Sequence, residues 1–249
     1  MKSLSLPINA LLWLATFACS PKENASSEAT ATATTTVFAD FAQTTLPYAA
    51  DTLLMNRMDK PLDAEKIAEV FRNVTEAIQY EGGAYYLKQF LYLDSLYKAN
   101  PNPTFDIGET VQMKAYALNQ WTVSNQAIAI TVLIEFKSYD ADPYRTGKIV
   151  TLFTCTPEGK PINSLVIAEY IKGSDPPYFS TTLVTATVAA NQEIQMQETV
   201  NSSEYLDNGM IETTLHSKEK VFRIEPDGKI SKVSEKEQPE QRFQKPANE

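Results

Sequence analysis

The stretch Ala127-Ile-Ala-Ile-Thr-Val-Leu-Ile-Glu-Phe-Lys137 decides the fold class of this chain. Every second residue in it is large and apolar, namely Ile128, Ile130, Val132, Ile134 and Phe136. A period of two is that of a β-strand, in which successive side chains point to opposite faces of the sheet. The stretch therefore predicts a core strand with one more polar side.

Similar runs follow one another through most of the chain, at residues 110–118, 149–156, 162–171, 180–189, 193–200, 210–217 and 221–224. Short turn sequences separate them, including Pro157-Glu158-Gly159, residues 173–177, Asp207-Asn208-Gly209 and Pro226-Asp227-Gly228. Links of this length join antiparallel neighbours, and none is long enough to hold the helix of a parallel crossover. We expect an antiparallel meander of about eight strands, strongly twisted or partly closed into a barrel.

Two helices are expected before the sheet. Apolar residues recur on one helical face, between a possible cap at Asp63 and Gly82-Gly83, at Ile67, Val70, Phe71, Val74 and Ile78. A second stripe ends at Asn100-Pro101 and consists of Tyr86, Phe90, Leu93 and Tyr97. The predicted fold class is therefore α+β, with two N-terminal helices laid on the sheet.

Composition limits the class of partner. The chain has 249 residues, a formal net charge of −9 and 21% charged residues. An acidic surface repels phosphate backbones, so no nucleic-acid partner is expected. The 43% hydrophobic content is ordinary for a globular protein.

The two ends of the chain differ from its middle. Residues 20–36 contain no aromatic side chain and no aliphatic side chain larger than alanine, and residues 235–249 are rich in Glu, Gln, Lys and Pro. Such segments bury too little apolar surface to order themselves. We expect a flexible linker over residues 19–37, a single domain over residues 38–234 and a disordered tail over residues 235–249.

The N-terminus resembles the signal sequence of bacterial lipoproteins. Lys2 precedes an apolar run over residues 4–17, and small Ala18 stands directly before Cys19. Thr16 departs from the usual pattern, which has leucine three residues before the cysteine. The resemblance implies cleavage after residue 18, a lipid such as palmitate on Cys19, and attachment to a membrane of the bacterial cell envelope. Ser20 favours the outer membrane, because many inner-membrane lipoproteins carry aspartate there; an ordinary secretory signal and an uncleaved anchor are the alternatives.

Few residues are candidates for catalysis. His216 is the only histidine, and although Glu212 and Ser217 are near it in sequence, no Gly-x-Ser-x-Gly turn is present. We expect His216 on the solvent face of a strand and Cys155 in the core, with no disulfide to Cys19. No phosphate-binding glycine loop is present, so no nucleotide cofactor is predicted.

Two further features are weak candidates for ligand binding. Asp140 and Asp142 are too few to form a calcium loop, so a solvated turn is favoured and no metal site is predicted. Trp121 is a candidate for stacking on a sugar, but a loop aromatic that closes the core is the favoured expectation.

These patterns predict a function only in outline. The expectation is a membrane-anchored, exported lipoprotein that acts as a binding or interaction module, with the membrane, an envelope protein or a glycan as partner and no enzymatic activity. The alternative is a carrier or chaperone for an apolar ligand such as a lipid, with a cavity behind Tyr86, Phe90 and Tyr97. A hydrolase built from scattered carboxylates is the least favoured.

Overall fold

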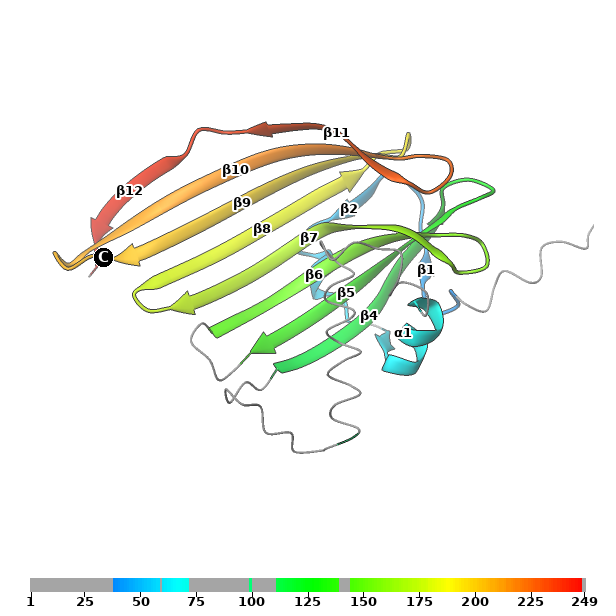
Figure 1. The fold of residues 1–249 in the computed structure, drawn as a ribbon, viewed down its shortest axis with the longest axis horizontal. Helices are drawn as coiled ribbons and strands as arrows, with labels where there is room; N and C mark the ends of the chain where they lie inside the picture. The colour runs from blue at the N-terminus through cyan, green and yellow to red at the C-terminus, as the bar shows by residue number, and fades with distance from the viewer. Residues whose placement is uncertain (1–37, 59, 72–98, 100–110, 139–143, 248–249) are drawn as a thin grey trace, which may run out of the picture. The chain divides into compact units, whose positions relative to one another are not determined.

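The computed structural model describes residues 38–58, 60–71, 99, 111–138 and 144–247 (Figure 1). The chain divides into two compact units, Met1–Ala33 and Thr34–Glu249, and all described residues belong to the second. Within them no helix is long and apolar enough to cross a membrane.

Twelve strands in one sheet make up most of the described residues. Their bounds are β1 Ala42–Gln43, β2 Tyr48–Ala50, β3 Pro61–Leu62, β4 Val111–Thr122, β5 Ile128–Ser138, β6 Tyr144–Cys155, β7 Pro161–Asp175, β8 Tyr178–Val188, β9 Glu193–Tyr205, β10 Met210–Ile224, β11 Ile230–Glu237 and β12 Gln241–Pro246. A 3-10 helix, η1 (Leu54–Asn56), and one α-helix, α1 (Ala64–Phe71), complete the elements of the described part.

The predicted α+β class with about eight strands and two helices is wrong. The described chain is nearly all β, and the sheet is mixed because β1 runs parallel to β4. From β4 to β11 each strand is antiparallel to the next, and the predicted turns at residues 157–159, 207–209 and 226–228 lie between strands. The predicted turn at 173–177 is shorter than expected, because β7 continues to Asp175. The extra strands are two- or three-residue pieces with no readable period, or polar strands at an edge.

The edge beside β10 shows why polar strands escape prediction. Residues 210–217 and 221–224, expected as two strands, form the single strand β10, since the charged residues Lys218 to Lys220 continue its extended backbone. Its two halves pair with different strands, β12 with residues Met210–Leu215 and β11 with Lys218–Ile224. Residues 235–249, expected as a disordered tail, thus contain the end of β11 and all of β12, and both strands are exposed over almost their whole length.

The helical predictions are only partly covered by the structure. Helix α1 begins after Asp63, whose side chain accepts a hydrogen bond from the backbone N–H of Lys66 at 2.8 Å, as expected for a cap. Ile67 is fully buried. The expected continuation of this helix to Ile78 and the whole expected helix around Tyr86 to Tyr97 lie outside the described residues.

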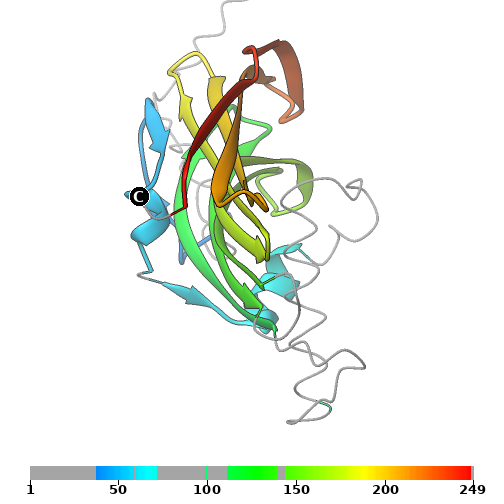
Figure 2. The same ribbon diagram turned by 90° about the vertical axis from the view of Figure 1, so that its left-hand side faces the viewer.

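The sheet separates into two layers at one end, and its curvature is visible in Figure 2. Strands β7 and β8 pair only over Glu169–Asp175 and Tyr178–Val184; beyond this point β2 replaces β7 as the neighbour of β8. The larger core cluster fills the space between the layers. Its members include Tyr48, Trp121, Leu133, Leu152, Val188 and Ile194.

A second core cluster covers the other face of β4 to β6. Phe38, Phe41 and Ile67 from the N-terminal segment pack there on Ile130, Val132, Ile134, Phe153 and Cys155. The decisive stretch around Ile128 is therefore buried on both faces, one in each cluster. The expected polar side of this strand carries Thr131, whose hydroxyl is buried and lies 3.2 Å from the Tyr48 hydroxyl.

The turn between β10 and β11 closes the separated end. The Thr154 hydroxyl donates a hydrogen bond to the carbonyl of Gly228, and the Ser124 hydroxyl donates one to the carbonyl of Pro226 at 2.6 Å. Gly228 has φ +86° and approaches Ile162 so closely that an added Cβ would lie 2.6 Å from its Cδ1. Only glycine fits this position without strain or displacement.

Candidate functional site

The candidate site lies at the end of the sheet opposite the β10–β11 turn. Two hairpin turns lie there side by side, because the N–H of Tyr205 donates to the carbonyl of Pro177 at 3.1 Å. Strand β12 adds a third segment, since Met210 pairs with Pro246. We call this region, residues 173–180, 202–214 and 242–246, the tip.

The β9–β10 turn at the tip is set by its sequence. The Asn208 side chain accepts a hydrogen bond from the N–H of Met210 at 3.0 Å, and Gly209 adopts φ +76°. Asparagine and glycine are the residues that such a tight hairpin turn favours. The turn thereby fixes the register of β9 against β10.

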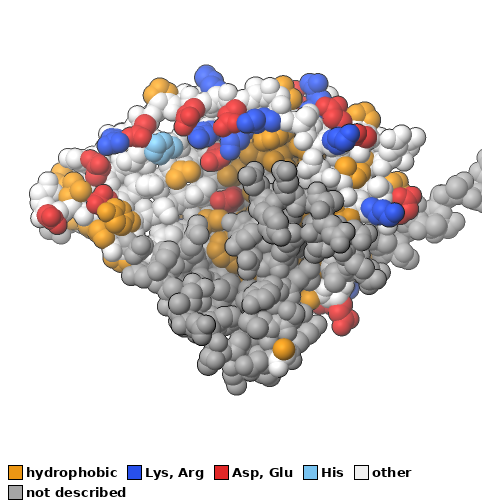
Figure 3. Space-filling view, viewed as in Figure 1, with side chains coloured by type: hydrophobic (Ala, Val, Ile, Leu, Met, Phe, Trp, Pro, Cys, Tyr) orange, Lys and Arg blue, Asp and Glu red, His pale blue; other side chains and the backbone are white. Residues whose placement is uncertain are grey.

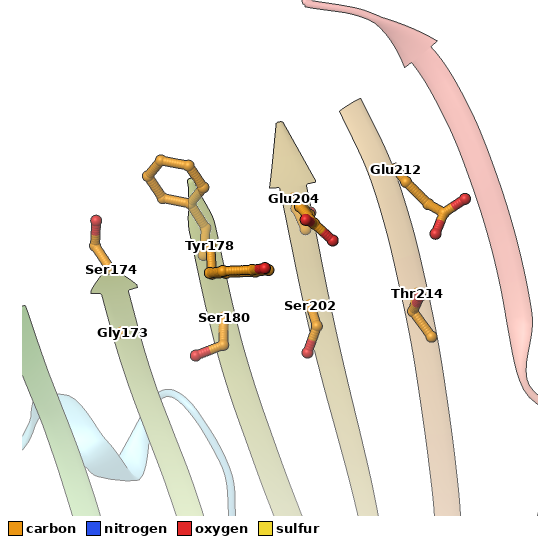
Figure 4. A pocket seen from close by; sticks show the side chains of 10 residues that line it. Gly173, Ser174, Tyr178, Ser180, Ser202, Glu204, Glu212 and Thr214 are labelled. Carbon is orange, nitrogen blue, oxygen red and sulfur yellow. The ribbon is translucent and has the colours of Figure 1, made fainter. Parts of the chain in front are cut away.

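A pocket of about 430 Å³ opens at the tip (Figure 4). Its lining is polar and aromatic and consists of Gly173, Ser174, Tyr178, Phe179, Ser180, Ser202, Ser203, Glu204, Glu212 and Thr214. These residues come from β7, β8, β9 and β10. No single segment of the sequence contains the site.

Two cross-strand rows build the inner face of the tip, the face that also carries His216. Direct partners in antiparallel strands point to the same side, so register identifies each row. The first row is Tyr178, Glu204, Glu212 and Gln244, and the second is Ser180, Ser202, Thr214 and Arg242. In Figure 4, Ser180, Ser202 and Thr214 lie across three neighbouring strands and Tyr178 extends from β8 toward β9.

Glu204 and Glu212 bring two carboxylates into one row. They are direct partners across β9 and β10, and like charges in this position repel. A hydrogen bond partly offsets this repulsion, since the Gln244 side-chain amide donates to the Glu212 carboxylate at 2.8 Å. The remaining carboxylate oxygens are suited to accept hydrogen bonds from a ligand that donates several of them.

Exposed aromatic side chains lie on both faces of the tip, with Tyr178 on the face of the carboxylates. Four of the eight large hydrophobic side chains that are exposed in the described residues lie at the tip, namely Tyr178 (54%), Phe179 (36%), Tyr205 (46%) and Phe243 (54%). The rings of Phe179 and Tyr205 meet edge to face with centroids 5.4 Å apart. This contact holds both rings in place at the surface.

The inner face continues from the tip into a second hollow of about 420 Å³ in the middle of β7 to β10. Val184, Met196 and Phe222 line it together with the ion pair between Lys220 and Glu198. Figure 3 shows charged side chains of both signs along the β10–β12 edge around His216. The tip is thus the more aromatic and hydroxyl-rich end of one polar surface.

His216 lies on the same strand face as Glu212 and Thr214, as predicted, but this is the inner face of the sheet, where the side chain is only partly exposed. Its Nε2 atom lies 3.3 Å from a Glu240 carboxylate oxygen, and its side chain is 39% exposed. Ser217 points to the opposite face of β10, so the two residues do not form a nucleophile and base pair. Among the described residues no group of three or more His, Cys, Asp or Glu side chains is placed to hold a metal ion.

The other sequence candidates do not enter the site. Cys155 is a buried free thiol in the core, as predicted, and burial raises its pKa to about 12. Trp121 is buried, as expected, but lies in strand β4 and not in a loop; its indole N–H donates to Gln192 at 3.4 Å. Cys19, Asp140, Asp142 and the aromatic stripe from Tyr86 to Tyr97 lie outside the described residues.

Sequence reasoning did not predict a site at the tip, and of the pocket residues it considered only Glu212, as a neighbour of His216. One signal was present: Tyr178, Phe179 and Tyr205 directly flank hairpin turns, where polar residues are the rule. Searches against protein-family models, curated proteins and solved structures give no match for this chain. The site must therefore be interpreted from its own chemistry.

Proposed function

We propose that the protein is a lipid-anchored binding module of the bacterial cell envelope, and that the tip pocket binds a glycan. Lipid on Cys19 would hold it to a membrane, with the outer membrane favoured, and residues 20–36 would separate the domain from the bilayer. The observation that carries the ligand class is the composition of the pocket, which combines hydroxyls, carboxylates and exposed aromatic rings in one hollow.

Each of these groups matches a feature of a sugar. Sugar hydroxyls are donors as well as acceptors, so they satisfy Glu204 and Glu212 and bond with the hydroxyls of Ser180, Ser202 and Thr214. The C–H face of a sugar ring is apolar and packs on an aromatic ring. A hydroxyl-rich, uncharged ligand also avoids the repulsion that two carboxylates impose on an anion.

A sedimentation assay tests the proposal. The mature protein is mixed with purified peptidoglycan, and separately with soluble envelope polysaccharide in affinity electrophoresis. We expect binding to at least one of them, with a loss of about tenfold or more in Glu204→Gln/Glu212→Gln, because hydrogen bonds to a charged acceptor are roughly twice as strong as neutral ones.

Glu219→Gln is the matched control, since Glu219 lies in the same strand β10 but on the opposite face and is exposed. Equal loss in this control, or unchanged binding in the double variant, would show that the tip carboxylates do not contact the glycan. If the protein binds neither peptidoglycan nor the soluble polysaccharide, the proposed glycan-binding function is wrong.

A further inference from the structure

The outer face of the tip carries a third cross-strand row. Phe179 pairs with Ser203, Ser203 with Thr213, and Thr213 with Phe243, so four side chains from β8, β9, β10 and β12 point to one side. The order along the row is aromatic, hydroxyl, hydroxyl, aromatic. The two central hydroxyls lie 2.9 Å apart and bond to each other.

The pocket connects this row with the inner face. Its lining includes Ser180, Ser202 and Thr214 from the inner rows and also Phe179 and Ser203 from the outer row. A ligand in the pocket therefore lies beside Phe179 and Ser203, the first two residues of the outer row. Phe243 is the next exposed ring along it.

The length of the row points to the size of the ligand. Three strand spacings of about 4.8 Å separate Phe179 from Phe243, so the two rings are roughly 14 Å apart. This distance is well beyond the width of one sugar ring. A ligand that uses both rings must be a chain.

From this arrangement we infer that the ligand is an extended, uncharged polysaccharide, which runs from the tip pocket over the outer face and stacks on Phe179 and Phe243. The inference rests on the proposed glycan-binding function and deepens it. The hydroxyl pair of Ser203 and Thr213 would bond to the sugar units between the two stacked rings.

The charge of the tip distinguishes a neutral polysaccharide from other ligands that could bind exposed aromatic rings. Asp175, Glu204, Asp207 and Glu212 lie at the tip and Glu240 lies beside it, against two basic residues, Lys245 and Arg242, of which Arg242 is paired with Glu240. The acidic excess opposes adsorption to anionic lipid headgroups and to polyanionic chains. It favours a neutral chain rich in hydroxyl donors.

Oligosaccharide ladders test the inference. Calorimetric titrations of the mature protein use oligomers of one to six units of β-1,4-linked N-acetylglucosamine, β-1,4-linked glucose and α-1,6-linked mannose. We expect the affinity in at least one ladder to rise tenfold or more from two to six units. Phe243→Ala should remove most of this rise while leaving the affinity for the shortest binding oligomer within about twofold.

Phe179→Ala should weaken both short and long oligomers, because Phe179 lines the pocket and begins the row. Leu53→Ala is the control, since Leu53 is 77% exposed and directly precedes η1, which contacts β2 and β6. Circular dichroism establishes that each variant is folded, and the high exposure of Phe243 makes its removal harmless to the core.

The outcomes separate the two proposals. Affinity that is independent of length, or a length dependence that survives Phe243→Ala, overturns the extended chain while a loss in Glu204→Gln/Glu212→Gln still supports the glycan pocket. Failure of all ladders overturns the extended chain of these sugar classes. A dimer in sedimentation velocity that Phe243→Ala abolishes would assign the row to a second copy of the chain and also overturn it.

Discussion

At the scale of single residues, the buried Cys155 thiol and Tyr48 hydroxyl make the stability of the folded state sensitive to high pH. Burial raises the pKa of the Cys155 thiol from 9.0 to about 12 and that of the Tyr48 hydroxyl from 10.0 to about 12. The unfolded chain loses these protons first, so the stability that they provide is complete below pH 9 and is lost as the pH rises toward 12. We expect the urea midpoint to fall between pH 8.5 and pH 10.5, as followed by tryptophan fluorescence.

Cys155→Ala and Tyr48→Phe remove one ionisable group each and should flatten this pH dependence. Tyr48→Phe also loses the hydrogen bond to Thr131, which costs about 1 kcal/mol at neutral pH. Thr131 remains satisfied, since its hydroxyl also bonds to the backbone of Asn119. The same alkaline slope in both variants would contradict the explanation.

The packing around Gly147 leaves no room for a side chain. An added Cβ would lie 2.7 Å from Cγ1 of Ile171 and 2.8 Å from the Phe136 ring, both of which are buried. We expect Gly147→Ala to lower the free energy of unfolding by about 1–3 kcal/mol through overpacking, as measured in urea.

Gly209→Asn is the comparison for this variant. Gly209 has positive φ but no neighbouring atom within 4 Å, and asparagine tolerates this conformation. Its loss of stability should be the smaller one. The reverse order would show that the space around Gly147 adjusts freely.

At the scale of elements, the β10–β11 turn depends on contacts with the β4–β5 link and with β6. Thr154→Val keeps the shape of the side chain but removes the hydrogen bond to the buried Gly228 carbonyl. We expect a loss of about 1–3 kcal/mol and faster hydrogen exchange at the amides of Gly228 and Lys229. Ser124→Ala, at an exposed site, should have a smaller effect. Unchanged exchange in Thr154→Val would show that the hydrogen bond from Thr154 does not hold the turn.

The sequence predicted elements where burial imposes a period. Residues 128–137 alternate clearly, and β5 is found at Ile128–Ser138. The period fails where a strand is solvated on both sides, as in β11, or where charges interrupt it, as at Lys218 to Lys220 in β10. Strands as short as β1 and β3 take their place from their partners in space, and no local pattern can mark them.

The site belongs to the scale of the whole molecule, and this is why sequence reasoning did not find it. Seven residues separate Glu204 from Glu212 in the sequence, and the two become direct partners through the register of β9 on β10. Phe179 and Phe243 share a row only because β12 returns to pair with β10. The register of the strands, which no local sequence pattern shows, brings the residues of the tip together.

We expect the proposed lipid anchor and the proposed glycan-binding surface to act independently of each other. Intact mass of the membrane-bound protein should show the loss of residues 1–18 and an added acyl mass on Cys19. Cys19→Ala should move the protein to the soluble fraction while its affinity for the glycan stays within about twofold, because Cys19 lies in a different compact unit from the tip. Membrane fractionation and affinity electrophoresis measure the two effects separately. A soluble, unlipidated wild type would reject the anchor and leave the binding surface intact, whereas a Cys19→Ala protein that is soluble but no longer binds would show that the lipid itself takes part in recognition.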